Sequence, residues 1–333
     1  MNQKYFIGID LSKEKIDCAI ILQDYSVFLE QVVKNQDAKI KSFIQAFIRK
    51  AKCNLSDVFI CAENTGIYGQ PLKRVCVDLG VDLWIETPTK IKRATLDIRG
   101  KSDRMDAQRI ADYALRYYDR RVLYTESSAD IEELAAIAKA RETILAQKVG
   151  IENQLSEAKS HDPRLYKKLQ SLYRAALRTF DRELQKMEKQ LTVVLKKNKE
   201  MNKNAELLMS IPGVGKQVAV QFIIHTNNFK NFDNAKHLAS YSGVVPFLNE
   251  SGKLIKRPRV SKMANLKIKT MLHMAALSAV RTKSELKEYY IRKVSQGKNK
   301  MSVINAIRNK LVHRIWAVIE RQTPYEWEVK NNF

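Results

Sequence analysis

The sequence predicts an N-terminal α/β domain followed by two mainly helical regions. Three observations support this prediction. Short β-rich runs alternate with helical spacings over residues 1–125, apolar residues recur every three or four positions over residues 126–204, and helical segments broken by glycine and proline fill residues 205–333. A chain of 333 residues is long enough to bury two or three separate hydrophobic cores.

The first region, residues 1–125, begins with three predicted strands. Tyr5–Asp10, Ile16–Leu22 and Val27–Val33 are β-rich runs separated by polar residues, which indicates tight turns. The segments that follow alternate between helical and strand-like spacing, at 40–50, 57–62, 72–79, 81–85 and 103–118. A meander of three strands followed by alternating helices and strands predicts a mixed α/β sheet of the ribonuclease H type.

The second region, residues 126–204, carries a narrow apolar stripe. Apolar residues recur at steps of three, four or seven until His161, Asp162 and Pro163 interrupt the pattern, which resumes at Leu169. Two long helices in an antiparallel hairpin are the simplest interpretation, and the stripe resembles a coiled-coil seam. Packing within one chain competes with packing between two copies, and the length and charge density favour a dimer contact.

The third region, residues 205–333, is predicted to be helical and is strongly basic. Residues 207–333 carry 22 basic and 7 acidic side chains, a net charge of +15, whereas residues 1–125 and 126–206 carry net charges of +5 and +3. Such an excess attracts a polyanion and releases its condensed counterions. We therefore expect a nucleic-acid partner rather than a membrane surface.

The remaining composition excludes several classes of protein. Cys18, Cys53, Cys61 and Cys76 form no CxxC pair, which favours reduced thiols over disulfides or a zinc site. No apolar run approaches the roughly 18 residues that span a bilayer, and charges interrupt any signal-peptide pattern. We expect a cytoplasmic, nucleoid-associated protein with no membrane contact.

Four carboxylates lie where one metal site could gather them. Asp10 and Glu63 end the first and fourth predicted strands, so they emerge side by side if those strands are neighbours in a ribonuclease H arrangement. Asp103 and Asp106 are three residues apart and face the same way from the first turn of a helix that Ser102 is expected to cap. Such hard oxygen ligands suit Mg²⁺ or Mn²⁺, and two ions about 4 Å apart would serve phosphodiester chemistry.

Each carboxylate also has a simpler explanation. Asp103 and Asp106 alone are typical of first-turn charges that the helix dipole favours, and Glu63 alone is weak evidence. Asp10 is harder to explain in this way, because an unpaired carboxylate ending an apolar central strand costs several kcal/mol. Together, in this α/β order, the four residues favour a metal site.

A glycine-rich turn between two helical patterns is a candidate phosphate-binding element. In the segment 210–217, Gly213 and Gly215 permit a tight turn whose backbone N–H groups, beside Lys216, lie at a helix N-terminus and could grip a phosphate. The segment resembles a DNA-binding helix-hairpin-helix motif. An ordinary turn between helices would use similar residues.

A cationic stretch without acidic residues follows. Its basic residues are Lys253, Lys256, Arg257, Arg259, Lys262, Lys267 and Lys269. Because solvated helix faces normally mix the two signs of charge, contact with backbone phosphates explains the stretch better. Glu250-Ser251-Gly252 places a hydroxyl in the predicted 246–258 loop just before it, but a Ser-Gly pair by itself is typical of a turn.

Five segments in order resemble one known family. They are IGIDLSK at 7–13, ENTG at 63–66, KSDRMDA at 101–107, IPGVG at 211–215 and YSGVVPFLNESG at 241–252. Together they resemble the DEDD transposases of the insertion-sequence one-ten family, which are also called bridge-RNA-guided recombinases. The resemblance covers nearly the whole chain.

This resemblance implies a RuvC-like catalytic domain at 1–125, a coiled-coil dimerisation region at 126–204 and a transposase domain at 205–333, assembled as a dimer of dimers. Asp10, Glu63, Asp103 and Asp106 would be Mg²⁺ ligands, and Ser251 would attack a DNA phosphodiester. A noncoding bridge RNA would pair with donor and target DNA, so the protein would mainly hold backbones.

One departure from the family pattern concerns the nucleophile. The family often has two serines before the glycine, whereas Glu250 precedes Ser251 here, so Ser261 is a second candidate. Three other functions compete: a Holliday-junction resolvase-like nuclease that uses metal-activated water, an actin-like sugar or acetate kinase, and a non-catalytic architectural DNA binder. The kinase needs a further glycine-rich phosphate loop, which the sequence lacks.

Overall fold

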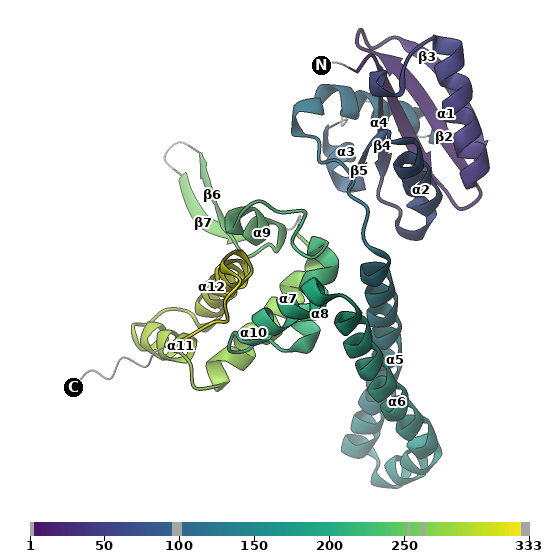
Figure 1. The fold of residues 1–333 in the computed structure, drawn as a ribbon. Coiled ribbons are helices and arrows are strands. Elements are labelled where there is room, and N and C mark those ends of the chain that lie inside the picture. The colour runs from purple at the N-terminus through teal and green to yellow at the C-terminus, as the bar shows by residue number, and fades with distance from the viewer. Residues whose placement is uncertain (1–2, 95–101, 252–253, 261–263, 328–333) are drawn as a thin grey trace. The chain divides into compact units, whose positions relative to one another are not determined.

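The structure is a computed structural model that describes residues 3–94, 102–251, 254–260 and 264–327 (Figure 1). Of residues 247–251 and 254–259 it describes only the backbone. The chain divides into two compact units, Met1–Glu126 and Ser127–Phe333, and each is described by itself.

The first unit is built on a five-stranded mixed sheet. Its strands are β1 (Tyr5–Leu11), β2 (Lys15–Leu22), β3 (Val27–Lys34), β4 (Val58–Glu63) and β5 (Asp82–Glu86). In the order β3-β2-β1-β4-β5, β2 is antiparallel to both β3 and β1, and β4 and β5 run parallel to β1. The predicted mixed sheet is confirmed, with β1 beside β4 as the ribonuclease H arrangement requires.

Helices cover both faces of this sheet. Those of the first unit are α1 (Asp37–Ala51), α2 (Gln70–Leu79), α3 (Pro88–Ala94) and α4 (Asp103–Arg116). Helices α1 and α2 bury Phe43 and Leu72 against one face, with Ile7 and Ile9 of β1. Helix α4 buries Ile110 against the other face. Because side chains alternate along a strand, the parity of each residue decides which helix it meets.

The second unit is mainly helical. Its elements are α5 (Ala129–His161), α6 (Pro163–Lys197), α7 (Lys199–Met209), α8 (Lys216–Thr226), α9 (Ala235–Tyr241), β6 (Pro246–Ser251), β7 (Leu254–Val260), α10 (Leu266–Arg281), α11 (Glu285–Ser295) and α12 (Lys300–Arg321). One hydrophobic core joins the start of α5 and the end of α6 to the later helices, with Leu134, Leu191 and Ile307 fully buried.

Helices α5 and α6 form the predicted antiparallel hairpin. The side chain of Asp162 accepts hydrogen bonds from the backbone N–H groups of Arg164 and Leu165, so it begins α6 directly after α5 ends. Ion pairs join Arg141 to Glu188 at 2.7 Å and Lys148 to Asp181 at 2.6 Å. Because the residue numbers rise along α5 as they fall along α6, the two helices are antiparallel. Dimerisation through this hairpin stays a prediction.

Asn198 ends α6 and caps α7 by accepting hydrogen bonds from two backbone N–H groups. One expectation for the second unit was wrong. The predicted 246–258 loop is instead the two-stranded antiparallel sheet β6-β7 (Figure 1). Pro246 is tolerated because it is the first residue of a strand, and Pro258 because each strand of a two-stranded sheet has a free edge.

The cysteines and the helix lengths agree with the composition. Cys18, Cys61 and Cys76 are buried, Cys53 is half-buried, and all four are free thiols. Burial raises the pKa of Cys76 to about 12, so this thiol is unreactive. Among the described residues, none of the helices combines the length and apolar character that crossing a membrane requires.

Candidate active site

The candidate site lies where β1 and β4 end. Ile9 of β1 pairs with Ala62 of β4 in parallel register, so Asp10 and Glu63 occupy the next position on two adjacent strands. Both side chains are half-buried. They lie on the face that α4 covers, because they share the parity of Phe6 and Cys61 in that core. The predicted pairing of Asp10 with Glu63 is therefore what the sheet produces.

A fifth carboxylate, Asp17, belongs to the same neighbourhood. Asp17 of β2 lies directly opposite Asp10 in the antiparallel register and is 7% exposed. The sequence interpretation missed this residue. The observation that singled out Asp10 in the sequence also applies to Asp17, because an aspartate inside an apolar strand needs a partner to offset its loss of hydration.

Gly8 allows α4 to approach this end of the sheet. A Cβ on Gly8 would lie 2.1 Å from the backbone oxygen of Ala107 and 2.3 Å from the backbone nitrogen of Ala111. Only glycine lets the backbone of α4 lie so close to β1. Since Asp103 and Asp106 are in the first turn of α4, this contact helps to bring them toward Asp10, and the sequence interpretation assigned Gly8 no role.

The electrostatics show that the predicted carboxylates share one environment. Burial, followed by the charges of Asp106, Asp103 and Asp17, raises the pKa of Asp10 above its ordinary value. Burial, followed by the charges of Asp10 and Asp106, raises the pKa of Glu63. These groups repel one another in a partly desolvated site, which is the condition that a bound cation relieves.

Two cations of the same unit hold part of this cluster. The Nζ of Lys15 lies 2.8 Å from a carboxylate oxygen of Asp103 and 3.0 Å from one of Asp17. Arg109 pairs with Asp106 at 2.7 Å. Lys15 thus joins the start of α4 to β2, a role that the sequence alone did not indicate.

The described residues contain no group of three or more His, Cys, Asp or Glu side chains already arranged to hold a metal ion. The structure brings Asp10, Glu63, Asp103 and Asp106 into electrostatic range without converging them on one point. Their chemistry still suits a divalent ion, because the donors are hard oxygens and their repulsion raises two of their pKa values. The shared metal site stays a prediction.

Glu86 shows how a neighbouring carboxylate differs. It is paired with Glu63 in the β4-β5 register and is 5% exposed. The backbone N–H of Thr87 donates to it at 2.7 Å, and the Nζ of Lys90 lies 3.0 Å away. Glu86 is therefore internally satisfied and is a structural group at the start of α3.

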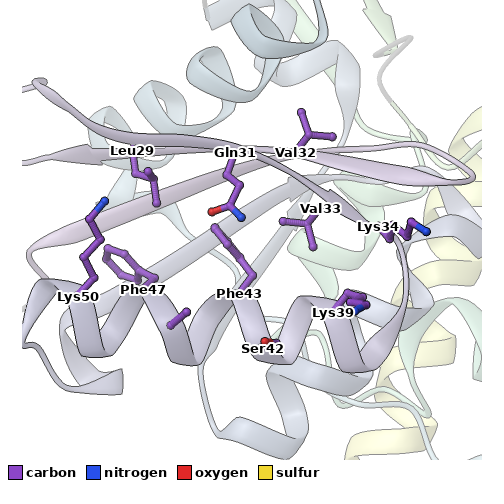
Figure 2. Close-up of a pocket in the computed structure, with 11 residues that line it drawn as sticks. Leu29, Gln31, Val32, Val33, Lys34, Lys39, Ser42, Phe43, Phe47 and Lys50 are labelled. Atoms are coloured by element: carbon purple, nitrogen blue, oxygen red, sulfur yellow. The ribbon is translucent and has the colours of Figure 1, made fainter.

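A groove on the other face of the sheet lies away from these carboxylates. Figure 2 shows it between β3 and α1, with a volume of about 440 Å³. Phe43 and Phe47 form apolar walls and Lys34, Lys39 and Lys50 lie at its margins. It is on the α1 face of the sheet, so it takes no part in the candidate site.

The turn at 210–217 has a clear packing role. Gly213 has φ +89°, and a Cβ there would lie 2.4 Å from the backbone oxygen of Ala275 in α10. Gly215 is the N-cap residue of α8, with open space around it. Lys216 donates to the hydroxyl of Thr192 at 2.8 Å. Packing accounts for Gly213, and nucleic-acid binding by this turn stays a prediction.

Ser251 is the last residue of β6, and its backbone pairs with Leu254 at the tip of the β6-β7 hairpin (Figure 1). The predicted phosphate contacts Lys256, Arg257 and Arg259 are on β7. Lys253, Ser261 and Lys262 lie outside the described residues. A hairpin rather than a loose loop therefore carries the candidate nucleophile and three of the predicted basic contacts.

Two family models match the chain. A transposase model of the DEDD type of IS110 matches residues 7–158, which include all four predicted ligands. The model "Transposase IS116/IS110/IS902 family" matches residues 205–291, which include Ser251. This chain belongs to the IS110 family of DEDD transposases. The family is the one that the five sequence segments resembled.

Similar proteins span most of the transposase. The pilin gene-inverting protein of Moraxella lacunata is 26% identical over 327 residues, which are 97% of this chain and 98% of the relative. The transposase for insertion sequence element IS1111A of Coxiella burnetii is 24% identical and covers 76% of this chain and 75% of its own. Among solved structures, T. thermophilus RuvC in complex with a Holliday junction substrate matches 36% of this chain and 98% of its own, with 13% identity and a TM-score of 0.29.

Family membership establishes the general chemistry. The transposase breaks and rejoins DNA, and its DEDD class depends on a divalent metal ion. Besides Asp17, the residues of the site that sequence reasoning missed are Lys15, Arg109 and Gly8. Each is identified by what it touches, and no local pattern marks such contacts.

Proposed function

We propose that this transposase cuts DNA with Ser251 as nucleophile, while Asp10, Glu63, Asp103 and Asp106 hold a divalent ion, Mg²⁺ or Mn²⁺. The observation that carries the metal part is that Asp10 and Glu63 lie half-buried at the ends of two adjacent strands, where burial and then the charges of neighbouring carboxylates raise the pKa of both groups. The part that concerns Ser251 rests on its position in the matched transposase segment and on its place at the hairpin tip.

The proposed step conserves the energy of the DNA backbone. The Ser251 oxygen bonds to a backbone phosphorus and the bond from that phosphorus to the 3′ oxygen breaks. The serine proton passes to solvent or a nearby base, and the leaving 3′ oxygen takes up a proton from solvent. The product is a phosphoserine link and a free 3′ hydroxyl, and attack by another 3′ hydroxyl reverses the step on a new strand. A bound divalent ion would stabilise the negative charge on the leaving oxygen.

Rejoining favours a covalent intermediate over hydrolysis. The Moraxella relative is a gene-inverting protein that aligns with 97% of this chain. Inversion must reseal every strand it opens, and a phosphoserine link retains the bond energy for resealing. The resolvase-like alternative, in which water cuts the strand, would leave ends that need a separate ligase.

The substrates in this proposal are donor DNA, target DNA and a noncoding bridge RNA, and the assembly is a tetramer built from dimers. The α5-α6 hairpin is the dimer contact, because its outer part exposes apolar side chains that a partner would cover: Leu165 is 46% exposed and Leu172 is 68% exposed. The basic residues of β7 bind backbone phosphates, which suits a protein whose sequence choice comes from base pairing.

Covalent capture tests the nucleophile. A nicked DNA substrate carrying the element's own ends should become attached to the wild-type protein, and the complex should survive denaturing electrophoresis. In Ser251→Ala the amount of attached DNA should fall at least about 1000-fold while DNA binding is retained. Ser261→Ala is the matched control and should still form the complex. Normal capture by Ser251→Ala, or loss only in Ser261→Ala, would overturn the assignment.

A further inference from the structure

Two arginines of α12 have opposite surroundings. Arg314 pairs with Glu285, which also accepts a hydrogen bond from the hydroxyl of Tyr325 at 2.8 Å. Arg308, nearly two turns earlier, is half-buried, and its Nε is fully buried with no hydrogen-bond partner among the described residues. Burial also lowers the pKa of Arg308. The second guanidinium therefore lacks the counter-charge that the first one has.

His273 lies beside Arg308 on the neighbouring helix. Helices α10 and α12 pack against each other, and the Nδ1 of His273 is also buried without a partner in the described part of the chain. Burial, followed by the charge of Arg308, lowers the pKa of His273. No carboxylate contributes to either shift. Two side-chain nitrogens on this packed helix pair are thus buried without a hydrogen-bond partner in the described part of the chain.

An unpaired, half-buried cation is costly unless an anion reaches it. Removing a charge from water is offset only by an opposite charge or by several hydrogen bonds. The planar guanidinium presents its donors as a fork that matches the oxygens of a phosphate. Acidic side chains are scarce in this part of the chain, since residues 207–333 carry 7 of them against 22 basic ones. The missing anion is therefore expected from a ligand.

The pair also lies near the β6-β7 hairpin. Asn305, one turn before Arg308 on α12, donates to the backbone oxygen of Val244 at 3.1 Å. Val244 is two residues before β6 begins. Residues three apart on a helix are neighbours on its surface, so Arg308 is within about one helical turn of the base of this hairpin. A strand of nucleic acid that contacts β7 would pass close to it.

We propose that Arg308 and His273 form a binding site for a backbone phosphate of nucleic acid. The site goes beyond the proposed function, because it requires neither the metal ion nor the serine. DNA and RNA share the phosphodiester group, so either can supply the phosphate.

The test measures equilibrium binding of the full-length protein in the presence of EDTA, so that no strand is cut. Binding to a fixed DNA duplex and to a single-stranded RNA is titrated at several salt concentrations. Loss of one phosphate contact in Arg308→Gln should reduce the slope of log K against log salt by about 0.9 on the duplex or about 0.7 on the single strand. The nucleic acid whose salt slope falls, the DNA duplex or the single-stranded RNA, is the one that supplies the phosphate.

A matched control separates a specific contact from a general loss of charge. Arg321→Gln removes the same charge from an exposed position of α12, and its slopes should stay at the wild-type values. The melting temperature of Arg308→Gln should equal or exceed that of the wild type, since an unpaired charge has been removed. Unchanged slopes with a lower melting temperature, or an equal fall in both variants, would overturn the proposal. Because no chemistry is involved, neither result bears on Ser251.

Discussion

The two units of the transposase treat charge in opposite ways. In the first unit the carboxylates gather at one end of a sheet, and cations of the same unit, Lys15 and Arg109, hold three of the five. In the second unit basic side chains greatly outnumber acidic ones, and the buried Nε of Arg308 has no hydrogen-bond partner among the residues that the structure describes. The first unit is therefore suited to bind a cation, and the second unit is suited to bind a polyanion.

The two units also hold their groups with different rigidity. Asp10 and Glu63 are fixed by adjacent strands of a five-stranded sheet whose two faces are covered by helices. Ser251 ends a strand that pairs only with β7. A precise metal site, as we propose for the first unit, needs residues held on such rigid elements.

The largest expected effect is on catalysis in the first unit. Asp10→Asn removes a charge that the proposed metal ion needs, so DNA strand cleavage should fall at least about 1000-fold, while DNA affinity, which we assign to the basic second unit, should change little. Cleavage assays and equilibrium DNA binding measure the two quantities. Glu86→Gln is the control carboxylate on β5, two strands from β1 in the same sheet, and should keep cleavage within about 10-fold. Equal losses in both variants would mean that Asp10 acts only by supporting the fold.

A smaller effect is expected where the helix meets the sheet. In Gly8→Ala the new Cβ collides with the backbone of α4, so the free energy of unfolding of the first unit should fall by about 3 kcal/mol or more. Gly150→Ala is the control in α5, where the added methyl meets open space, and it should raise stability by about 1 kcal/mol. Urea unfolding followed by circular dichroism measures the change in the free energy of unfolding in both variants. A stable Gly8→Ala protein would show that α4 can shift away from β1.

The smallest effect sharpens the role of Lys15. Lys15→Met leaves Asp17 and Asp103 without their shared cation, so the melting temperature of the metal-free protein should fall by less than in Gly8→Ala. Added Mg²⁺ should then raise the melting temperature of the variant more than that of the wild type, because the ion replaces the missing charge. Calorimetry with and without Mg²⁺ measures this difference. If Mg²⁺ raised the melting temperature of the variant and the wild type equally, Lys15 would have no role at the metal site.

Much of the fold followed from local pattern. The five strands of the first unit and the helices α1, α2 and α4 lie within a few residues of the predicted positions, because apolar spacing reports which side of each element is buried. The short helix α3 was missed because Ile91 is its one buried residue, which gives no apolar spacing to recognise. The hairpin β6-β7 was predicted as a loop because Pro258 and the basic residues conceal its strand pairing.

The sequence by itself determined the composition of the two charge systems, the order of the elements and the family, since these depend on which residues occur and at what spacing. Only the tertiary structure decided that Asp17 faces Asp10, that Lys15 joins Asp103 to Asp17, and that Arg308 lacks the partner that Arg314 has. Such contacts join residues far apart in the chain or on different elements. They depend on how strands register and helices pack, and no local spacing records that.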